Sequence, residues 1–214
     1  MNTITCTIEG TTALLQNRYK MAISPATGGT KKTARTGEPD WFSEWKDKLY
    51  LDQDGCISMP ARPIEKSMER AAVQFKIAGK RGKTHKDLVG SMVFVSPSII
   101  PFDGGIVPPQ TTEAQALFES GLVYESNGDP MWRPRSGLFY IDLEPVVIQR
   151  ARVVRSRPAL AAGWRLSFDI VVRTDQLQLP TLQQILEYAG QNVGIGDFRP
   201  RFGQFRIVSF DEKK

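Results

Sequence analysis

The chain has 214 residues, with a hydrophobic fraction of 41% and a charged fraction of 24%, which is ordinary for a globular protein of one or two domains. No apolar run approaches the roughly 20 residues that cross a bilayer, and the N-terminus has no basic or apolar region of a secretory signal. We therefore expect a cytoplasmic protein without a membrane partner. Its net charge of +5 favours an anionic partner.

The first half of the chain begins with a loosely alternating stretch, Thr3 to Leu15, which predicts a strand. Residues 21–40 have no core-forming pattern and are expected to be a long mobile insertion. Asp40 is a predicted N-cap of a short helix. Residues 49–57 are typical of a hairpin that turns at Asp52 to Gly55.

A helix is predicted from Pro63 to about Ala78, because its apolar residues recur at helical spacing. A second insertion is expected at 79–90, and a strand at 91–96. The insertion is basic, and its candidate nucleic-acid-binding residues are Lys80, Arg81 and Lys83.

A third insertion is expected over 103–136. Beyond it, 164–172 alternates between apolar and polar residues, 180–189 has helical spacing, and 204–210 is a final strand. Together with the elements before it, this order predicts a single α+β domain over 1–214. Its fold is expected to be ferredoxin-like, a split βαβ–βαβ sheet with two helices and long insertions.

The two cysteines, Cys6 and Cys56, are too few for a disulfide framework or a four-ligand zinc site. We expect reduced, buried thiols, no metal and no cofactor. The basic residues are unevenly placed, since every one between Gly128 and Val208 is an arginine. The planar guanidinium group matches phosphate oxygens and can stack on bases.

A glycine-rich segment joins the last helix to the last strand. Glycines let a backbone approach a ligand closely, and successive N–H groups in such a loop can bind an anion. Phenylalanines alternate with arginines here, as suits a single strand whose bases stack while its phosphates meet cations. The candidate binding residues are Gly190, Gly194, Gly196, Arg199, Arg201, Phe202, Gly203 and Arg206.

The segment is not a P-loop, because it lacks the lysine and hydroxyl and follows a helix instead of preceding one. A dinucleotide-binding fingerprint fails on the same context. The structural alternative is a helix C-cap at Gly190 followed by a tight turn, with the phenylalanines in the core.

The segments 182–190, 194–200 and 203–205 resemble the glycine-rich loop of RAMP proteins, which are RRM-like subunits of CRISPR effector complexes. Residues 8–15 are similar to the first strand of such domains. Residues 49–55, with the Pro63 helix, resemble uncharacterised phage proteins of the same group.

The resemblance to RAMP backbone subunits implies binding of a nucleic-acid strand along a groove and a protruding hairpin. It also implies head-to-tail assembly into a homo-oligomer, or a CRISPR-like assembly. Residues 146–172 are the candidate hairpin. The arginines expected near its tip are Arg150, Arg152, Arg155 and Arg157. Their alternative role is that of a solvated edge that discourages aggregation.

Catalytic chemistry is sparse in the sequence. His85 is the only histidine and lies in the basic insertion, where we expect it to be exposed. Asp52 and Asp54 are interpreted as turn formers. Asp103 is the loop carboxylate to test, because some RAMP backbone subunits cleave RNA with a loop aspartate.

We therefore expect a non-catalytic protein that binds single-stranded RNA or DNA. The alternatives are a phage structural or interaction protein without nucleic acid, and a RAMP-type ribonuclease.

Overall fold

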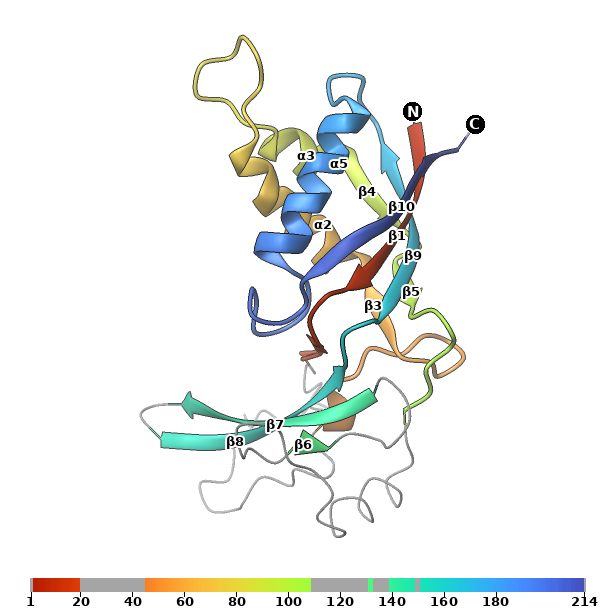
Figure 1. The fold of residues 1–214 in the computed structure, drawn as a ribbon, viewed down its shortest axis with the longest axis vertical. Coiled ribbons are helices and arrows are strands. Elements are labelled where there is room, and N and C mark those ends of the chain that lie inside the picture. The colour runs from red at the N-terminus through yellow and green to blue at the C-terminus, as the bar shows by residue number, and fades with distance from the viewer. Residues whose placement is uncertain (1, 20–44, 109–130, 133–138, 149–150, 214) are drawn as a thin grey trace, which may run out of the picture.

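The structure is a computed structural model that describes residues 2–19, 45–108, 131–132, 139–148 and 151–213 (Figure 1). Four antiparallel strands form the main sheet, in the spatial order β10-β1-β9-β4. They are β1 (Asn2–Gly10), β4 (Val93–Ser96), β9 (Arg165–Val172) and β10 (Phe205–Glu212). Helices lie between β1 and β4 and again between β9 and β10, so the expected ferredoxin-like α+β fold is confirmed.

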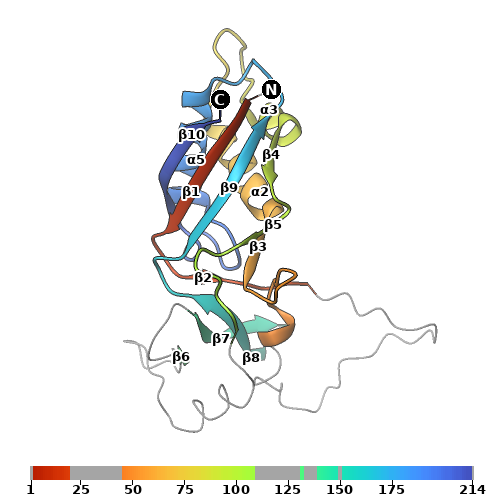
Figure 2. The same ribbon diagram turned by 90° about the vertical axis from the view of Figure 1, so that its right-hand side faces the viewer.

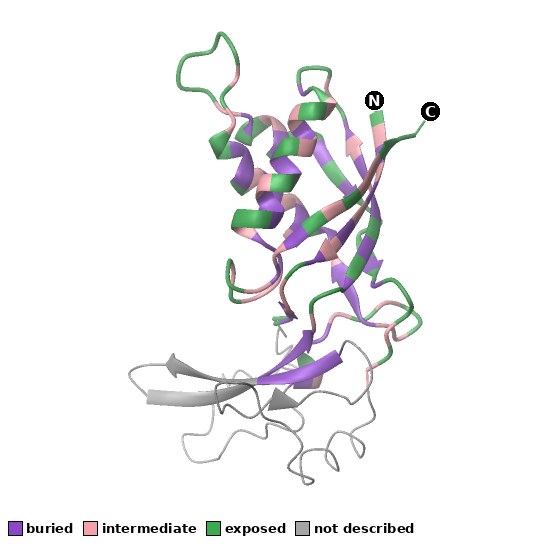
Figure 3. Ribbon diagram, viewed as in Figure 1, coloured by how far each residue is buried: buried purple, intermediate pink, exposed green. Residues whose placement is uncertain are grey.

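Two helices, α2 (Ala61–Ala71) and α5 (Leu179–Tyr188), cover one face of this sheet, and the opposite face is open (Figures 1 and 2). The strand pattern explains why. On β1 and β9 every second residue is buried, and those residues are apolar, so each strand has one face that must be covered (Figure 3). Ile64 and Met68 of α2 and Ile185 of α5 are fully buried in this core.

A long hairpin, β7 (Phe139–Ile148) with β8 (Ala151–Leu160), extends from the end of the main sheet (Figure 1). It belongs to a second sheet with β2 (Leu14–Leu15) and β6 (Met131–Trp132), in the order β2-β8-β7-β6. A protruding hairpin was expected at 146–172. That placement is wrong, because β8 pairs with β7 and not with β9, which lies in the main sheet.

Arg157 was expected near the hairpin tip, and this too is wrong. It pairs with Asp142 toward the base of the hairpin, whereas Ala151 and Ile148 are the last pair before the turn. Arg152 lies next to that pair, opposite Val147.

Several smaller expectations are also resolved. The strand predicted over Thr3–Leu15 is two strands in different sheets, since β1 ends at Gly10. The insertion predicted at 79–90 contains a helix, α3 (Lys86–Met92). The turn after residue 51 is confirmed, with Asp52 Oδ1 accepting hydrogen bonds from the N–H groups of Asp54 (3.0 Å) and Cys56 (2.8 Å). It precedes a small sheet of β3 (Ser58–Pro60) and β5 (Ile99–Pro101).

The predicted helix cap Asp40, the insertion at 21–40 and most of the insertion at 103–136 lie outside the described residues. Within the described residues, no helix has both the length and the apolar character needed to cross a membrane.

The two cysteines have different surroundings, which predicts different reactivity. Cys6 is fully buried, and burial, with a smaller contribution from the Asp211 carboxylate, raises the pKa of its thiol to about 12. Only about one Cys6 thiol in ten thousand is then ionised at pH 8. Cys56 is half-buried.

We expect one thiol per native chain to react with a disulfide reagent at pH 8, and the second only after unfolding in urea. Cys56→Ser should remove the native reaction. Equal reaction rates for both thiols would contradict the buried position of β1.

Candidate nucleic-acid interface

The glycine-rich segment begins where α5 ends, but Gly190 is not the helix cap that one reading of the sequence placed there. The chain continues through a π-helical turn, Ala189–Val193, and the left-handed cap is Gly194, with φ of 71°. Gly190 is buried against β10, where a Cβ would lie 2.2 Å from the carbonyl oxygen of Phe205. Its role is therefore close packing of helix on strand.

The backbone of the loop faces inward. The N–H of Gly194 donates to Ala189 (2.8 Å), and that of Ile195 donates to Gly203 (2.9 Å). The N–H of Gly203 in turn donates to the carbonyl of Ala13 (2.7 Å). For Gly194 and Gly203 the expectation of amides in an open anion site is wrong, because their N–H groups already donate to carbonyls within the fold.

Asp197 fixes the outer part of the loop. Its N–H donates to the carbonyl of Leu15 (2.9 Å), and its Oδ2 accepts from Asn17 Nδ2 (3.3 Å). The same oxygen lies 3.0 Å from Nε of Arg157, whose side chain is almost fully buried. This ion pair joins the base of the β7–β8 hairpin to the glycine-rich loop.

The three phenylalanines of the segment lie at different depths. Phe205 is buried in the core and Phe202 is half-buried, whereas Phe198 is 44% exposed. The rings of Phe198 and Phe202 meet edge to face, with centroids 6.2 Å apart. The guanidinium of Arg201 lies 5.7 Å from the Phe202 ring centroid. Only part of the aromatic cluster is thus available to a ligand.

Arg199 and Arg201 lie on the outer side of this loop, and neither takes part in an ion pair with a described residue. Burial lowers the pKa of the Arg199 guanidinium, the neighbouring Arg70 of α2 lowers that pKa further, and Asp197 partly offsets both. Two cations held near each other without a bridging carboxylate would both be stabilised by an anion.

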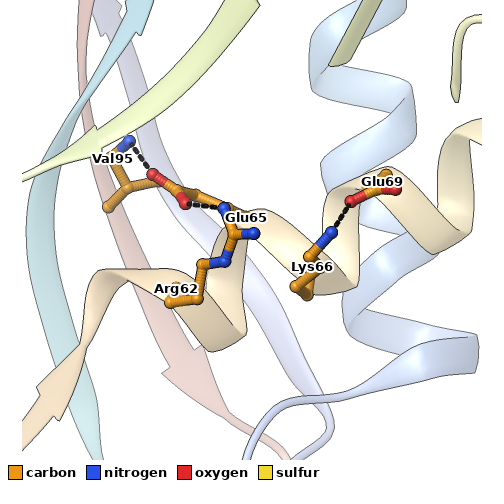
Figure 4. A network of polar contacts seen from close by, with 5 residues as sticks. All are labelled: Arg62, Glu65, Lys66, Glu69 and Val95. Atoms are coloured by element: carbon orange, nitrogen blue, oxygen red, sulfur yellow. Dashed lines mark hydrogen bonds and ion pairs between the residues drawn. The ribbon is translucent and has the colours of Figure 1, made fainter. Parts of the chain in front are cut away.

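Most other cations near α2 are paired. Arg62 lies 3.5 Å from Glu65, and Lys66 donates to Glu69, as Figure 4 shows. Glu65 also accepts a 3.0 Å hydrogen bond from the N–H of Val95 on the edge strand β4. Among the described cations of this helix, Arg70 alone has no carboxylate partner.

The open face of the sheet is different, because three of its cations pair with carboxylates. Arg206 and Arg165 both contact Glu9, each at 2.7 Å, and together they lower the pKa of that carboxyl. Lys213 likewise pairs with Asp169 (2.7 Å). The sequence grouped Arg206 with the loop arginines. In the structure, Arg206 instead pairs with Glu9 on the open face of the sheet.

The remaining predicted binding residues lie elsewhere. Lys80, Arg81 and Lys83 are exposed in a loop at the end of the helical layer opposite to the glycine-rich loop (Figure 1). Arg150 lies outside the described residues, as do the side chains of Arg152 and Arg155. The structure thus brings together Arg157, Arg199 and Arg201 from the predicted set.

Two residues considered for catalysis are also separated from the loop. His85 is not exposed as expected but buried, and its N–H donates to the carbonyl of Phe75 (2.9 Å) before α3. Asp103 is exposed near β9 and accepts a 3.2 Å hydrogen bond from Ser167. The described residues contain no cluster of three or more metal-binding side chains.

Sequence reasoning missed two residues of this site, Arg70 and Asp197. Arg70 belongs to a helix more than 100 positions from the loop, and nothing in local spacing indicates that the two meet. Asp197 stands inside the quoted motif, but its role depends on Arg157.

The fold and the loop together define a ferredoxin-like α+β protein with a hairpin docked on its last helix–strand connection. Neither a protein-family model nor a curated protein matches the chain. Among solved structures, it is similar to a chain of the Type III-B Cmr-beta, determined by cryo-EM bound to cognate target RNA. The TM-score is 0.56 at 10% sequence identity, over 100% of this chain and 61% of that chain. The likeness shows the shared fold, and this chain spans less than two thirds of the longer one.

The inward packing of the loop can be tested at Gly203. Its φ is +74°, and a Cβ would lie 1.8 Å from the carbonyl oxygen of Ile195. Gly82 is a matched control, with φ of +73° and nothing within 4 Å of a Cβ. Gly82→Ala should lower the free energy of unfolding by about 1 kcal/mol, the usual strain of a left-handed residue.

Gly203→Ala should lower it by about 3 kcal/mol or more, because a backbone atom must move as well. Urea denaturation measures both values. Similar losses in the two variants would show that the loop is not closely packed.

Proposed function

We propose that this protein binds single-stranded nucleic acid, RNA or DNA, through the surface formed by Arg70, Arg199 and Arg201, here called the loop surface. The observation that carries the proposal is the difference in ion pairing between this surface and the open sheet face. The loop surface holds cations without carboxylate partners, whereas Arg165, Arg206 and Lys213 on the open sheet face pair with Glu9 and Asp169.

The physical reason is the response of this cluster to a phosphate. Burial and then the charge of Arg70 lower the pKa of Arg199, and a phosphodiester close to both cations would offset the effect of Arg70. Guanidinium groups donate hydrogen bonds to phosphate oxygens with matched geometry. Because both partners are charged, these hydrogen bonds are stronger than those between neutral groups. Exposed aromatic area beside the cations adds contact for bases.

The similarities support the same class of ligand. The glycine-rich segment resembles that of RAMP proteins, and the fold is similar to a chain of the Cmr-beta bound to target RNA. We infer from both that the chain is a RAMP-like binding protein. In contrast to the mechanism expected from sequence, side chains and not glycine amides would contact the strand.

We propose further that binding is non-catalytic. Asp103 hydrogen-bonds to Ser167 next to the open sheet face, and His85 lies beside α3 with its backbone engaged. Neither side chain contacts the loop surface in the structure. Labelled RNA incubated with the wild type should stay intact, and cleavage that Asp103→Ala abolishes would instead establish the ribonuclease.

The loop surface predicts a specific effect of removing two charges. Arg199→Ala with Arg201→Ala should weaken binding of a fluorescent 20-nucleotide poly(U) or poly(dT) strand by about tenfold or more. The slope of log affinity against log salt should also fall by about 1.4, since each phosphate contact on a single strand contributes about 0.7. Fluorescence anisotropy at several salt concentrations measures both.

The matched control is Arg165→Ala with Arg206→Ala, which removes the same charge from the open face. It should bind nearly as the wild type does. Equal weakening in both variants would mean that binding follows net charge alone. No binding by the wild type, with an absorbance ratio of clean protein after purification, would favour a structural or interaction protein instead.

We also propose that copies assemble head-to-tail on one strand, as the RAMP resemblance implies. Light scattering of the protein with a 40-nucleotide RNA should give a mass of several chains per strand, while the protein alone gives a smaller mass. A complex of one chain per strand at saturating protein would contradict assembly.

A further inference from the structure

We propose that Phe198 stacks on a nucleobase, and that the buried guanidinium of Arg157 is the positioning residue that holds Phe198 for this role. The inference rests on the proposed function, because it adds a base contact to the phosphate contacts of the loop surface. It also assigns a role to the hairpin base, which the loop surface alone does not use.

The backbone of Phe198 is the first observation. Its φ of 59° is the only left-handed value among the described residues other than glycine. Bulky residues rarely adopt this conformation, and it persists only where surrounding structure holds it. A glycine or asparagine would suit a simple turn at this position better than phenylalanine does.

The contacts that hold Phe198 come from its neighbours. Asp197 is fixed by the carbonyl of Leu15 and by Arg157, as described above. The Cζ of Arg157 lies 5.4 Å from the Phe198 ring centroid, and the Phe202 ring meets Phe198 at 72°. One Arg157 side chain therefore contacts both the carboxylate before Phe198 and the ring itself.

In this pair the charged residue, Arg157, is buried and the apolar residue, Phe198, is exposed. Arg157 is only 6% exposed, and its Nη1 has no hydrogen-bond partner among the described residues, whereas the apolar Phe198 ring is 44% exposed. Burying an incompletely paired guanidinium is unfavourable, so stability alone does not account for the arrangement. A supported ring projecting beside unpaired arginines is the arrangement in which a base stacks while its phosphates meet cations.

A nucleobase fits this ring better than an apolar protein side chain does. Arg199 and Arg201 follow Phe198 closely in the chain and have no ion-pair partner in the described structure. An apolar protein partner would have to desolvate these charges, whereas a strand brings phosphates to them.

The experiment uses a single strand with one 2-aminopurine among thymidines and a matched strand in which abasic sites replace the bases. Wild-type protein should quench the 2-aminopurine and bind the strand with bases more tightly. Phe198→Ala should lose the quenching and about tenfold in affinity for that strand, keep its salt slope, and leave abasic binding unchanged. Phe198→Tyr should retain quenching.

Arg157→Ala should also lose the quenching, and adding it to Phe198→Ala should cause no further loss of quenching, because both act through one ring. Arg157→Lys serves as the second variant if the alanine protein does not fold. Lysine keeps the positive charge but cannot contact both Asp197 and the Phe198 ring as the guanidinium does. Arg157→Lys should therefore reduce quenching while the salt slope stays unchanged.

The outcomes separate this inference from the proposed function. If the wild type binds but Phe198→Ala quenches and binds equally well, the stacking role is wrong and the loop surface stands. Equal losses on the base-containing and abasic strands would also overturn stacking. If the wild type binds neither strand even at low salt, the proposed function itself fails.

Discussion

The ion pair between Arg157 and Asp197 reinforces a junction between two parts of the chain that the backbone hydrogen bond from Asp197 to Leu15 also holds. One partner belongs to the second sheet and the other to the connection between α5 and β10. Because the Arg157 side chain is almost fully buried, losing Asp197 would leave an uncompensated charge inside the protein, which is far more costly than losing an exposed pair. The position of the hairpin base and the shape of the outer loop are therefore set together.

The glycines of the loop serve this docking and not a ligand directly. Gly196 faces Leu14 and Leu15, and Gly203 lies against the backbone at Ile195, so the chain can close on itself only without side chains there. Because the N–H groups of Gly194 and Gly203 are used internally, we expect side chains to supply most of the surface open to a ligand. The glycines that suggested an amide anion site in the sequence thus position a surface made of arginine and phenylalanine side chains.

Local periodicity was enough to predict β9, α5 and β10 within one or two residues, because each buries one face and repeats its apolar residues accordingly. Periodicity contains no information about which strands pair, so the hairpin was placed at 146–172 although β8 pairs with β7. The direction of the loop amides was not predictable for a similar reason. It depends on the carbonyls of Ala13 and Leu15, which lie far away in the sequence. The same limit applies to His85, whose basic neighbours suggested exposure although the residue is buried.

Electrostatics, more than topology, distinguishes the loop surface from the open sheet face as a place for a nucleic-acid strand. A strand on the open sheet face would have to separate Glu9 from its two arginines, and it would then meet the carboxylates of Asp169 and Asp103. The only described aromatic ring exposed there, Phe94, is on an edge strand, where Arg173 lies 4.7 Å from its centroid. At the loop surface the balance is reversed, since the nearby carboxylate of Asp197 is already neutralised by Arg157 from within. With Arg157 paired to it, Asp197 only partly offsets the effect of Arg70 on Arg199, and a phosphate approaching Arg199 meets net positive charge at close range.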